Sequence, residues 1–114
     1  LFLTFGHHDH DIALFPGSPD ASKGKEIEHV ALELEGDYTL DNLRRVYATF
    51  LEKQVHVVEI LNHGVSVGIY FLDPDGHMLE VLAQVVDPAG GAAIEELGRN
   101  GGMADPIELT PLYD

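Results

Sequence analysis

The stretch from Val67 to Leu82 constrains this chain most, because two apolar runs there flank a short polar turn. The turn reads Asp-Pro-Asp-Gly at positions 73–76, which supplies a side-chain acceptor, a fixed φ angle, a turn-tolerant aspartate and a glycine for positive φ. Turn residues of this kind between two apolar runs predict a β-hairpin with strands at 67–72 and 77–86.

The second strand of this hairpin carries a carboxylate on an unexpected face. Side chains alternate along a strand, so Glu80 lies opposite Leu79 and Val81 and shares a mostly apolar row with Met78 and Leu82. A carboxylate among apolar side chains needs hydrogen-bond donors or a cation. The strand alone leaves two interpretations open: a functional carboxylate, or a glutamate on an edge strand that reaches water.

Composition limits the classes of function. The 114 residues suffice for one domain, and no apolar run approaches the roughly 20 residues that span a bilayer. The formal net charge of −14 disfavours binding to nucleic acid or to an anionic membrane, and it fits either a halophilic surface or an acidic mesophilic enzyme. The chain has no Cys, so a metal would need His, Asp or Glu ligands. Because no apolar run could span a bilayer, we expect a cytoplasmic protein.

A β-α-β-β-β unit is predicted from residue 28 to residue 86. It begins with a strand at 28–34, which places His29 on the more polar face. A helix follows, with Thr39 as the expected N-cap. Its apolar stripe comprises Leu40, Leu43, Tyr47, Phe50 and Leu51. A strand at 55–61 then leads through a short turn to the central hairpin.

The segments around this unit are patterned less regularly. Residues 1–15 contain two short apolar runs that predict a second hairpin, in which His10 shares a face with apolar side chains. Residues 16–27 are rich in Pro, Gly and Ser and are expected to form a linker. Residues 87–114 read as a C-terminal tail on the surface or against a partner subunit, with a short helix at 92–97.

Three segments together resemble a known family. They read HHDHDIALFP, EHVALEL and NHGVSVGIYFLDPDGHMLEVL, starting at positions 7, 28 and 62. This pattern resembles the vicinal oxygen chelate superfamily of glyoxalases, bleomycin resistance proteins and extradiol dioxygenases, and most of all its type I, catechol 2,3-dioxygenase-like members. The resemblance implies an α+β fold of paired β-α-β-β-β modules whose mixed sheet curls into a cup. Residues 1–15 would then end an incomplete first module, and residues 28–86 would form the second.

The resemblance implies a divalent metal at the bottom of this cup. His29 and Glu80 match two of the family's three ligand positions. The residue types agree, because two His and one carboxylate with open positions suit non-haem Fe(II), although Mn(II) or another divalent metal fits the same donors. The third ligand has no counterpart here, so we expect it on a segment upstream of Leu1 or from a second subunit. Dioxygen would be the co-substrate.

Roles for three further residues follow from the same resemblance. His10 matches an acid/base His that stabilises bound oxygen, and His63 and Tyr70 match groups that contact a catechol hydroxyl. Imidazole and phenol groups suit this chemistry, because an aromatic diol loses protons on binding and a later intermediate needs a positioned acid. Two simpler roles stay open: a turn residue for His63 and a core aromatic for Tyr70.

The leading interpretation is an Fe(II)-dependent extradiol dioxygenase that acts on a small aromatic diol and works as a homo-oligomer, a dimer being expected. Two alternatives stay open. Another metal-dependent member of the superfamily, such as a glyoxalase-type isomerase, an epimerase or a thiol transferase, would share His29 and Glu80 without needing His10, His63 or Tyr70. A non-catalytic module would bind a small aromatic without turning it over.

Overall fold

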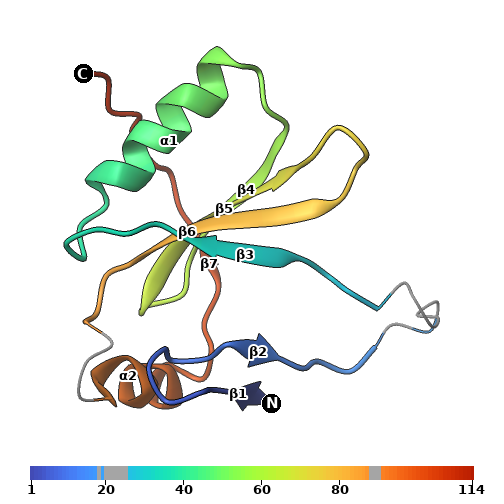
Figure 1. The fold of residues 1–114 in the computed structure, drawn as a ribbon, viewed down its shortest axis with the longest axis vertical. Coiled ribbons are helices and arrows are strands. Elements are labelled where there is room, and N and C mark those ends of the chain that lie inside the picture. Colours follow the sequence, from blue (N-terminus) through green and yellow to red (C-terminus); the bar gives the residue numbers. More distant parts are fainter. Residues whose placement is uncertain (18, 20–25, 88–90) are drawn as a thin grey trace.

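The structure is a computed structural model that describes residues 1–17, 19, 26–87 and 91–114. Seven strands and two helices follow one another along these residues (Figure 1). They are β1 (Phe2–Leu3), β2 (Ile12–Ala13), β3 (Val30–Glu33), α1 (Asp41–Glu52), β4 (Val57–Asn62), β5 (Ser66–Leu72), β6 (Met78–Gln84), α2 (Ala92–Asn100) and β7 (Asp105–Pro106). The predicted α+β class is confirmed.

Five of the strands form one mixed sheet in the order β3-β6-β5-β4-β7. The strands β3 and β6 run parallel, and every other neighbouring pair is antiparallel. The central hairpin forms as predicted, because Asp73 Oδ1 accepts hydrogen bonds from the backbone N–H groups of Asp75 and His77, and Gly76 takes a positive φ of 88°. Because β6 pairs with β5 on one side and with β3 on the other, it lies inside the sheet and not at its edge.

The hydrophobic core lies between α1 and one face of this sheet. Leu43 of α1 and Ile69 of β5 are fully buried there, with Val81 and Ala83 of β6 beside them. Val81 and Ala83 belong to the apolar row that strand alternation predicts for β6, so Glu80 and Gln84 point to the opposite face. The alternation therefore fixes which side chains remain available for a site.

The ends of the first helix differ from the sequence-based expectation. The N-cap is Leu40 and not Thr39, since the Thr39 hydroxyl donates to Asp37 Oδ1 at 2.7 Å and lies 3.5 Å from the Asp41 amide. Leu51 is 46% exposed, so the buried stripe ends at Phe50. A local side-chain hydrogen bond here moved the helix start by one residue.

The C-terminal segment is more than a tail. Its helix α2 extends to Asn100, beyond the predicted end at residue 97. The strand β7 then pairs with β4, and Leu109 enters the hydrophobic core. The expectation of a segment lying only on the surface is wrong for these residues, because an edge strand and an apolar side chain anchor them.

The other face of the sheet is covered by the β1–β2 hairpin and by α2 (Figure 1). The hairpin is shorter than predicted, with two residues in each strand. Residues 18 and 20–25 of the predicted linker lie outside the described residues, and the predicted module boundaries stay predictions. Within the described part of the chain, none of the helices has the length and apolar character needed to cross a membrane.

Candidate metal and substrate site

A cavity of about 440 Å³ lies on the sheet face opposite α1. Strands β3, β5 and β6 form one wall, while the β1–β2 hairpin and residues from α2 onward close the others. Every residue singled out from the sequence lines this cavity, namely His10, His29, His63, Tyr70 and Glu80. The structure therefore brings together side chains that are up to 70 positions apart in the chain.

His29 and Glu80 meet because β3 and β6 are parallel neighbours, with Ala31 opposite Glu80 in the register. The His29 Nε2 atom lies 3.2 Å from Glu80 Oε1, and the other ring nitrogen, Nδ1, lies 2.5 Å from Glu28 Oε2. Glu80 is only 5% exposed. The hydrogen bond to Glu80 raises the pKa of His29 above its ordinary value, against the opposing effect of burial.

This pair has the donor arrangement of a metal site. A carboxylate that accepts the Nδ1 proton of His29 leaves the Nε2 lone pair facing Glu80, as in many metal-binding histidines. Two acceptors at 3.2 Å repel unless a proton or a cation lies between them. The His29 nitrogen and the Glu80 oxygen therefore fit a divalent metal of borderline or hard character.

Glycine at position 68 makes room for this carboxylate. A Cβ atom built there would lie 1.9 Å from Glu80 Oε2 and 2.8 Å from the carboxyl carbon. Any other residue would therefore push the Glu80 side chain out of its place. The backbone of β5 thus helps to fix the orientation of the carboxylate.

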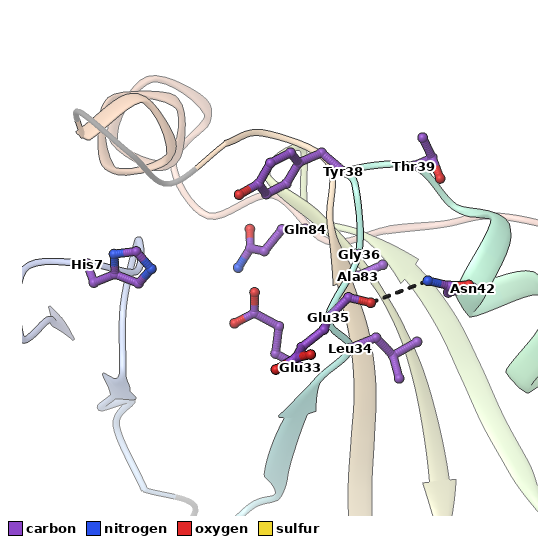
Figure 2. A pocket seen from close by; sticks show the side chains of 10 residues that line it. All are labelled: His7, Glu33, Leu34, Glu35, Gly36, Tyr38, Thr39, Asn42, Ala83 and Gln84. Carbon is purple, nitrogen blue, oxygen red and sulfur yellow. Dashed lines mark hydrogen bonds between the residues drawn. The ribbon is translucent and has the colours of Figure 1, made fainter.

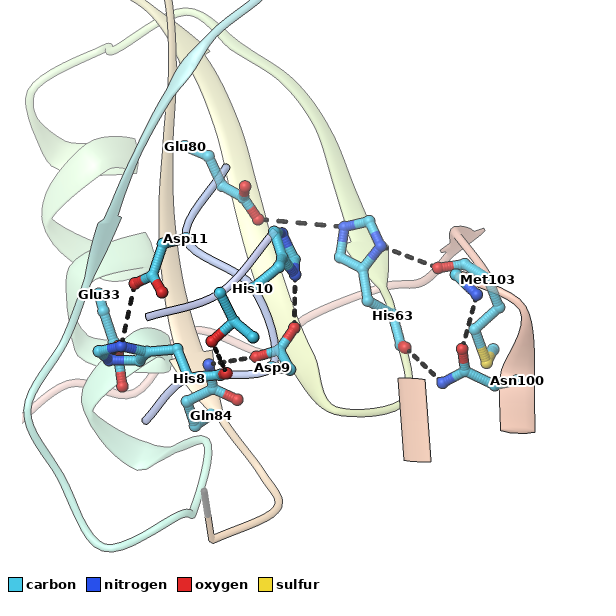
Figure 3. A network of polar contacts seen from close by, with 12 residues as sticks. His8, Asp9, His10, Asp11, Glu33, His63, Glu80, Gln84, Asn100 and Met103 are labelled. Carbon is cyan, nitrogen blue, oxygen red and sulfur yellow. Dashed lines mark hydrogen bonds and ion pairs between the residues drawn. The ribbon is translucent and has the colours of Figure 1, made fainter. Parts of the chain in front are cut away.

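His63 and Tyr70 form a hydrogen-bonded pair next to Glu80. The Tyr70 hydroxyl lies 2.9 Å from His63 Nε2. The same nitrogen is 4.0 Å from Glu80 Oε2 (Figure 3). His63 Nδ1 donates to the backbone carbonyl of Met103 at 2.8 Å, so the neutral ring accepts the Tyr70 proton at Nε2. Asn100 also holds the His63 backbone, donating to its carbonyl at 3.0 Å.

The Tyr70 hydroxyl is harder to deprotonate here than in water. Burial raises the pKa of its hydroxyl above the ordinary value, and the negative charge of Glu80 raises it further. The Tyr70 ring also meets the His29 ring edge to face, with centroids 5.1 Å apart. Tyr70 is therefore a hydrogen-bonding group that contacts both His29 and His63.

His10 belongs to the β1–β2 hairpin and faces the same cavity from the opposite side. Its Nδ1 atom lies 2.6 Å from Asp9 Oδ2, and Gln84 of β6 donates to Asp9 Oδ1 at 3.2 Å (Figure 3). The hydrogen bond that His10 donates to Asp9 raises the pKa of His10, and burial opposes this. For Asp9, burial raises the pKa, but the His10 contact and the Gln84 amide outweigh it, and the net shift is downward.

A second polar contact ties the hairpin to the sheet. His8 Nε2 lies 2.8 Å from Glu33 Oε2 of β3, and His8 Nδ1 lies 3.4 Å from Asp11 Oδ1. A smaller cavity of about 210 Å³ begins here, and it shares Glu33 and Gln84 with the large one (Figure 2). His7 and Tyr38 line it from opposite sides in this view.

Among the described residues, a different group also has metal-ligand geometry. The ligand atoms of Asp73, Asp75 and His77 lie within 4.8 Å of one another in the β5–β6 turn. Both oxygens of Asp73 are already engaged, one by two backbone amides and the other by His77 Nδ1 at 3.0 Å. These contacts account for the cluster as part of the turn.

Sequence reasoning missed the residues that hold the site in place. Asp9 and Gln84 support His10, whereas Asn100 and the carbonyl of Met103 support His63. The position of Gln84 beside Glu80 on one strand face was a usable signal, because strand alternation places both in the cavity. Met103 gave none, because it contributes only a backbone carbonyl. Asn100 gave none either, because its side-chain amide reaches the His63 carbonyl only once the chain has folded.

Known proteins resemble this chain over most of its length. The family model described as Glyoxalase/Bleomycin resistance protein/Dioxygenase superfamily matches residues 2–81. The curated protein biphenyl-2,3-diol 1,2-dioxygenase 2 from Rhodococcus globerulus is 29% identical over 85 residues, which cover 70% of this chain. The match spans only 43% of the length of that relative. Solved structures gave no significant match.

Proposed function

Because the chain belongs to the glyoxalase/bleomycin resistance protein/dioxygenase superfamily, we propose that it carries a metal-dependent extradiol dioxygenase site. The reaction would open a catecholic ring beside its two hydroxyls. One observation carries the proposal: the His63–Tyr70 pair lies beside Glu80 while His10 faces the same cavity. Superfamily members with other activities would need the metal ligands but not these three groups.

His29 and Glu80 would hold the metal, through an imidazole nitrogen and a carboxylate oxygen. When bound, a divalent metal such as Fe(II) supplies a Lewis acid for the two substrate hydroxyls and a place for dioxygen. Iron is proposed over other metals because it supports dioxygen chemistry on His and carboxylate ligands. A third ligand from a preceding segment or from a second subunit remains part of this proposal.

The chain's own residues would handle the protons. The neutral His63 ring offers Nε2 as an acceptor, so the His63–Tyr70 pair can take a proton from one substrate hydroxyl and hold the oxygen by a hydrogen bond. His10 favours its protonated form, since Asp9 stabilises the positive charge. It can therefore donate a proton at Nε2 to an oxygen that gains negative charge during ring opening.

The cavity suits an aromatic substrate without demanding one particular diol. Its apolar lining includes Phe2, Ala13, Phe15, Val65, Leu82 and Leu97. The volume of about 440 Å³ lies in the usual range of small-molecule sites. The relative from Rhodococcus globerulus is named for biphenyl-2,3-diol, which makes that compound a sensible first substrate.

The test is oxygen consumption by the protein, loaded anaerobically with Fe(II) and offered catechol or biphenyl-2,3-diol. We expect uptake of oxygen together with a yellow ring-opened product. Turnover of the hemithioacetal of methylglyoxal and glutathione instead would favour the isomerase alternative. Saturable diol binding without oxygen uptake would favour a binding module.

Variants separate the metal ligands from the proton-transfer groups. His29→Ala and Glu80→Ala should lose bound metal in elemental analysis, whereas His10→Phe should keep it and turn over about 10²- to 10⁴-fold more slowly. His77→Ala, an exposed residue of the β5–β6 turn, is the matched control and should resemble the parent. Parent-like turnover in His10→Phe would contradict the proposal.

A further inference from the structure

Asp9 is buried in a place where a carboxylate is not expected. It lies in the connection between β1 and β2, flanked by the half-buried His8 and His10, yet it is only 5% exposed. Burial of a charged carboxylate is unfavourable unless hydrogen bonds or an opposite charge compensate for it. The hydrogen-bond partners of Asp9 therefore explain why this carboxylate is buried.

The partners of Asp9 come from two separate elements. Oδ2 lies 2.6 Å from His10 Nδ1, and Oδ1 accepts a hydrogen bond of 3.2 Å from the Gln84 amide on β6. The Gln84 carbonyl oxygen is buried and has no hydrogen-bond partner among the described residues. The Gln84 amide thus donates to Asp9 although the Gln84 carbonyl oxygen stays unpaired, which is unfavourable for a buried acceptor.

These contacts determine what His10 presents to the cavity. Since Nδ1 donates its proton to Asp9, Nε2 carries the lone pair of the neutral ring or the second proton of the cationic ring. The ring face packs against Phe2, with centroids 4.9 Å apart, and Phe2 in turn lies against Gly102. Both the tautomer of His10 and the orientation of its ring are therefore constrained.

We propose that Asp9, held by Gln84, is a positioning residue that fixes His10 as the Nδ1–H tautomer with Nε2 facing the cavity. This inference rests on the proposed function, in which His10 transfers a proton at Nε2. With Nδ1–H held on Asp9, the cationic ring gives up its proton at Nε2 and returns to the Nδ1–H tautomer. A ring that favoured the other tautomer would give up the Nδ1 proton instead, and a rotated ring would turn Nε2 away from the cavity. Asp9 acts through His10 and does not itself touch the substrate.

Nitrogen-15 NMR of the histidine rings tests the tautomer directly, without any turnover. In the parent protein, the neutral form of His10 should be almost entirely Nδ1–H. In Asp9→Asn, the weaker amide acceptor should let the Nε2–H tautomer appear as a substantial fraction. An unchanged tautomer in Asp9→Asn would overturn the proposal.

Kinetics then measure the consequence for the reaction. We expect kcat of Asp9→Asn to fall about 10- to 100-fold while KM for the diol stays within about twofold, because the metal ligands and the His63–Tyr70 pair are unaffected. A fall in kcat matched by an equally large rise in KM would instead indicate general damage to the site. A parent without ring-cleaving activity would overturn the proposed function, yet the NMR result would still decide the role of Asp9.

Asp11→Asn is the matched control in the same hairpin. Asp11 Oδ2 accepts a hydrogen bond from the Phe5 backbone amide at 2.6 Å, so this variant loosens the hairpin without removing the partner of His10. It should leave the His10 tautomer unchanged. The same tautomer shift in both variants would mean that hairpin loosening and not Asp9 controls the ring.

Discussion

Two β-hairpins face each other across the cavity, and they are built very differently. β5 and β6 pair over seven residues, and Ile69 of β5 is fully buried in the core. β1 and β2 pair over two residues each, and Ile12 of β2 is 47% exposed. The long hairpin carries Tyr70 and Glu80, whereas the short one carries His10 in the connection between its two strands.

The difference indicates how the proposed tasks are divided. A metal ligand benefits from a rigid strand inside a sheet, and Glu80 has that support on both sides. His10 relies on a segment whose attachment to the sheet includes the Asp9–Gln84 and His8–Glu33 contacts. Segments with few buried apolar contacts open at low free-energy cost, so we expect the short hairpin to open before the sheet unfolds.

Removing the same side chain from each hairpin should give the largest contrast. Ile69→Ala deletes a fully buried side chain and should lower the free energy of unfolding by about 2–5 kcal/mol. Ile12→Ala removes a half-exposed one and should change it by no more than about 0.5 kcal/mol. Urea unfolding followed by circular dichroism measures both. Equal losses would mean that the two hairpins form one cooperative unit.

Gly68→Ala should change the orientation of the Glu80 carboxylate on the long hairpin without removing any functional group. The added Cβ would displace the Glu80 carboxylate, because the two would otherwise lie 1.9 Å apart. We expect metal affinity to fall at least about tenfold, measured by titration calorimetry, since supporting interactions typically contribute this much. Gly98→Ala on α2 meets open space and serves as the control, with unchanged affinity. Parent-like affinity in Gly68→Ala would remove Glu80 from the metal site.

The long hairpin was predictable from the sequence over nearly its whole length, whereas the short one was predicted with longer strands than the two-residue strands that form. Turn chemistry at positions 73–76 and strand alternation act over a few residues, so they fixed the hairpin and the face of Glu80. The same local rules placed Tyr70 on the cavity side. They also indicated His29, although its contact with Glu80 depends on the parallel pairing of β3 with β6.

The supporting contacts were beyond local reasoning. Gln84 and Asp9 are 75 residues apart, and His63 and the Met103 carbonyl are 40 apart. Such pairs form only after the whole chain has packed, and neither alternation nor turn composition encodes them. Leu109 is a similar case, because its burial depends on how the C-terminal segment crosses the sheet next to α1.

The smallest expected effect concerns the pH dependence of the short hairpin. The folded pKa of Asp9 lies below its ordinary 3.8, so the stability that Asp9 contributes is present above this pH and is lost as the pH falls further. The folded pKa of His10 lies above its ordinary 6.5, so its contribution is complete below 6.5 and is lost as the pH rises through the folded value. Hairpin stability should therefore be highest between pH 3.8 and 6.5.

Hydrogen exchange of the Asp11 and Leu14 amides, which bond across the short hairpin to Leu3 and Leu1, reports this stability. Because His10 is partly exposed, we expect the protection to vary by less than about 1 kcal/mol over the whole pH range. Asp9→Asn removes the Asp9 carboxyl group and, with it, the main cause of the raised His10 pKa. Amide protection in this variant should therefore hardly change with pH. A parent-like profile in Asp9→Asn would show that other groups govern the opening, and the short hairpin would then be held mainly by its contact between His8 and Glu33.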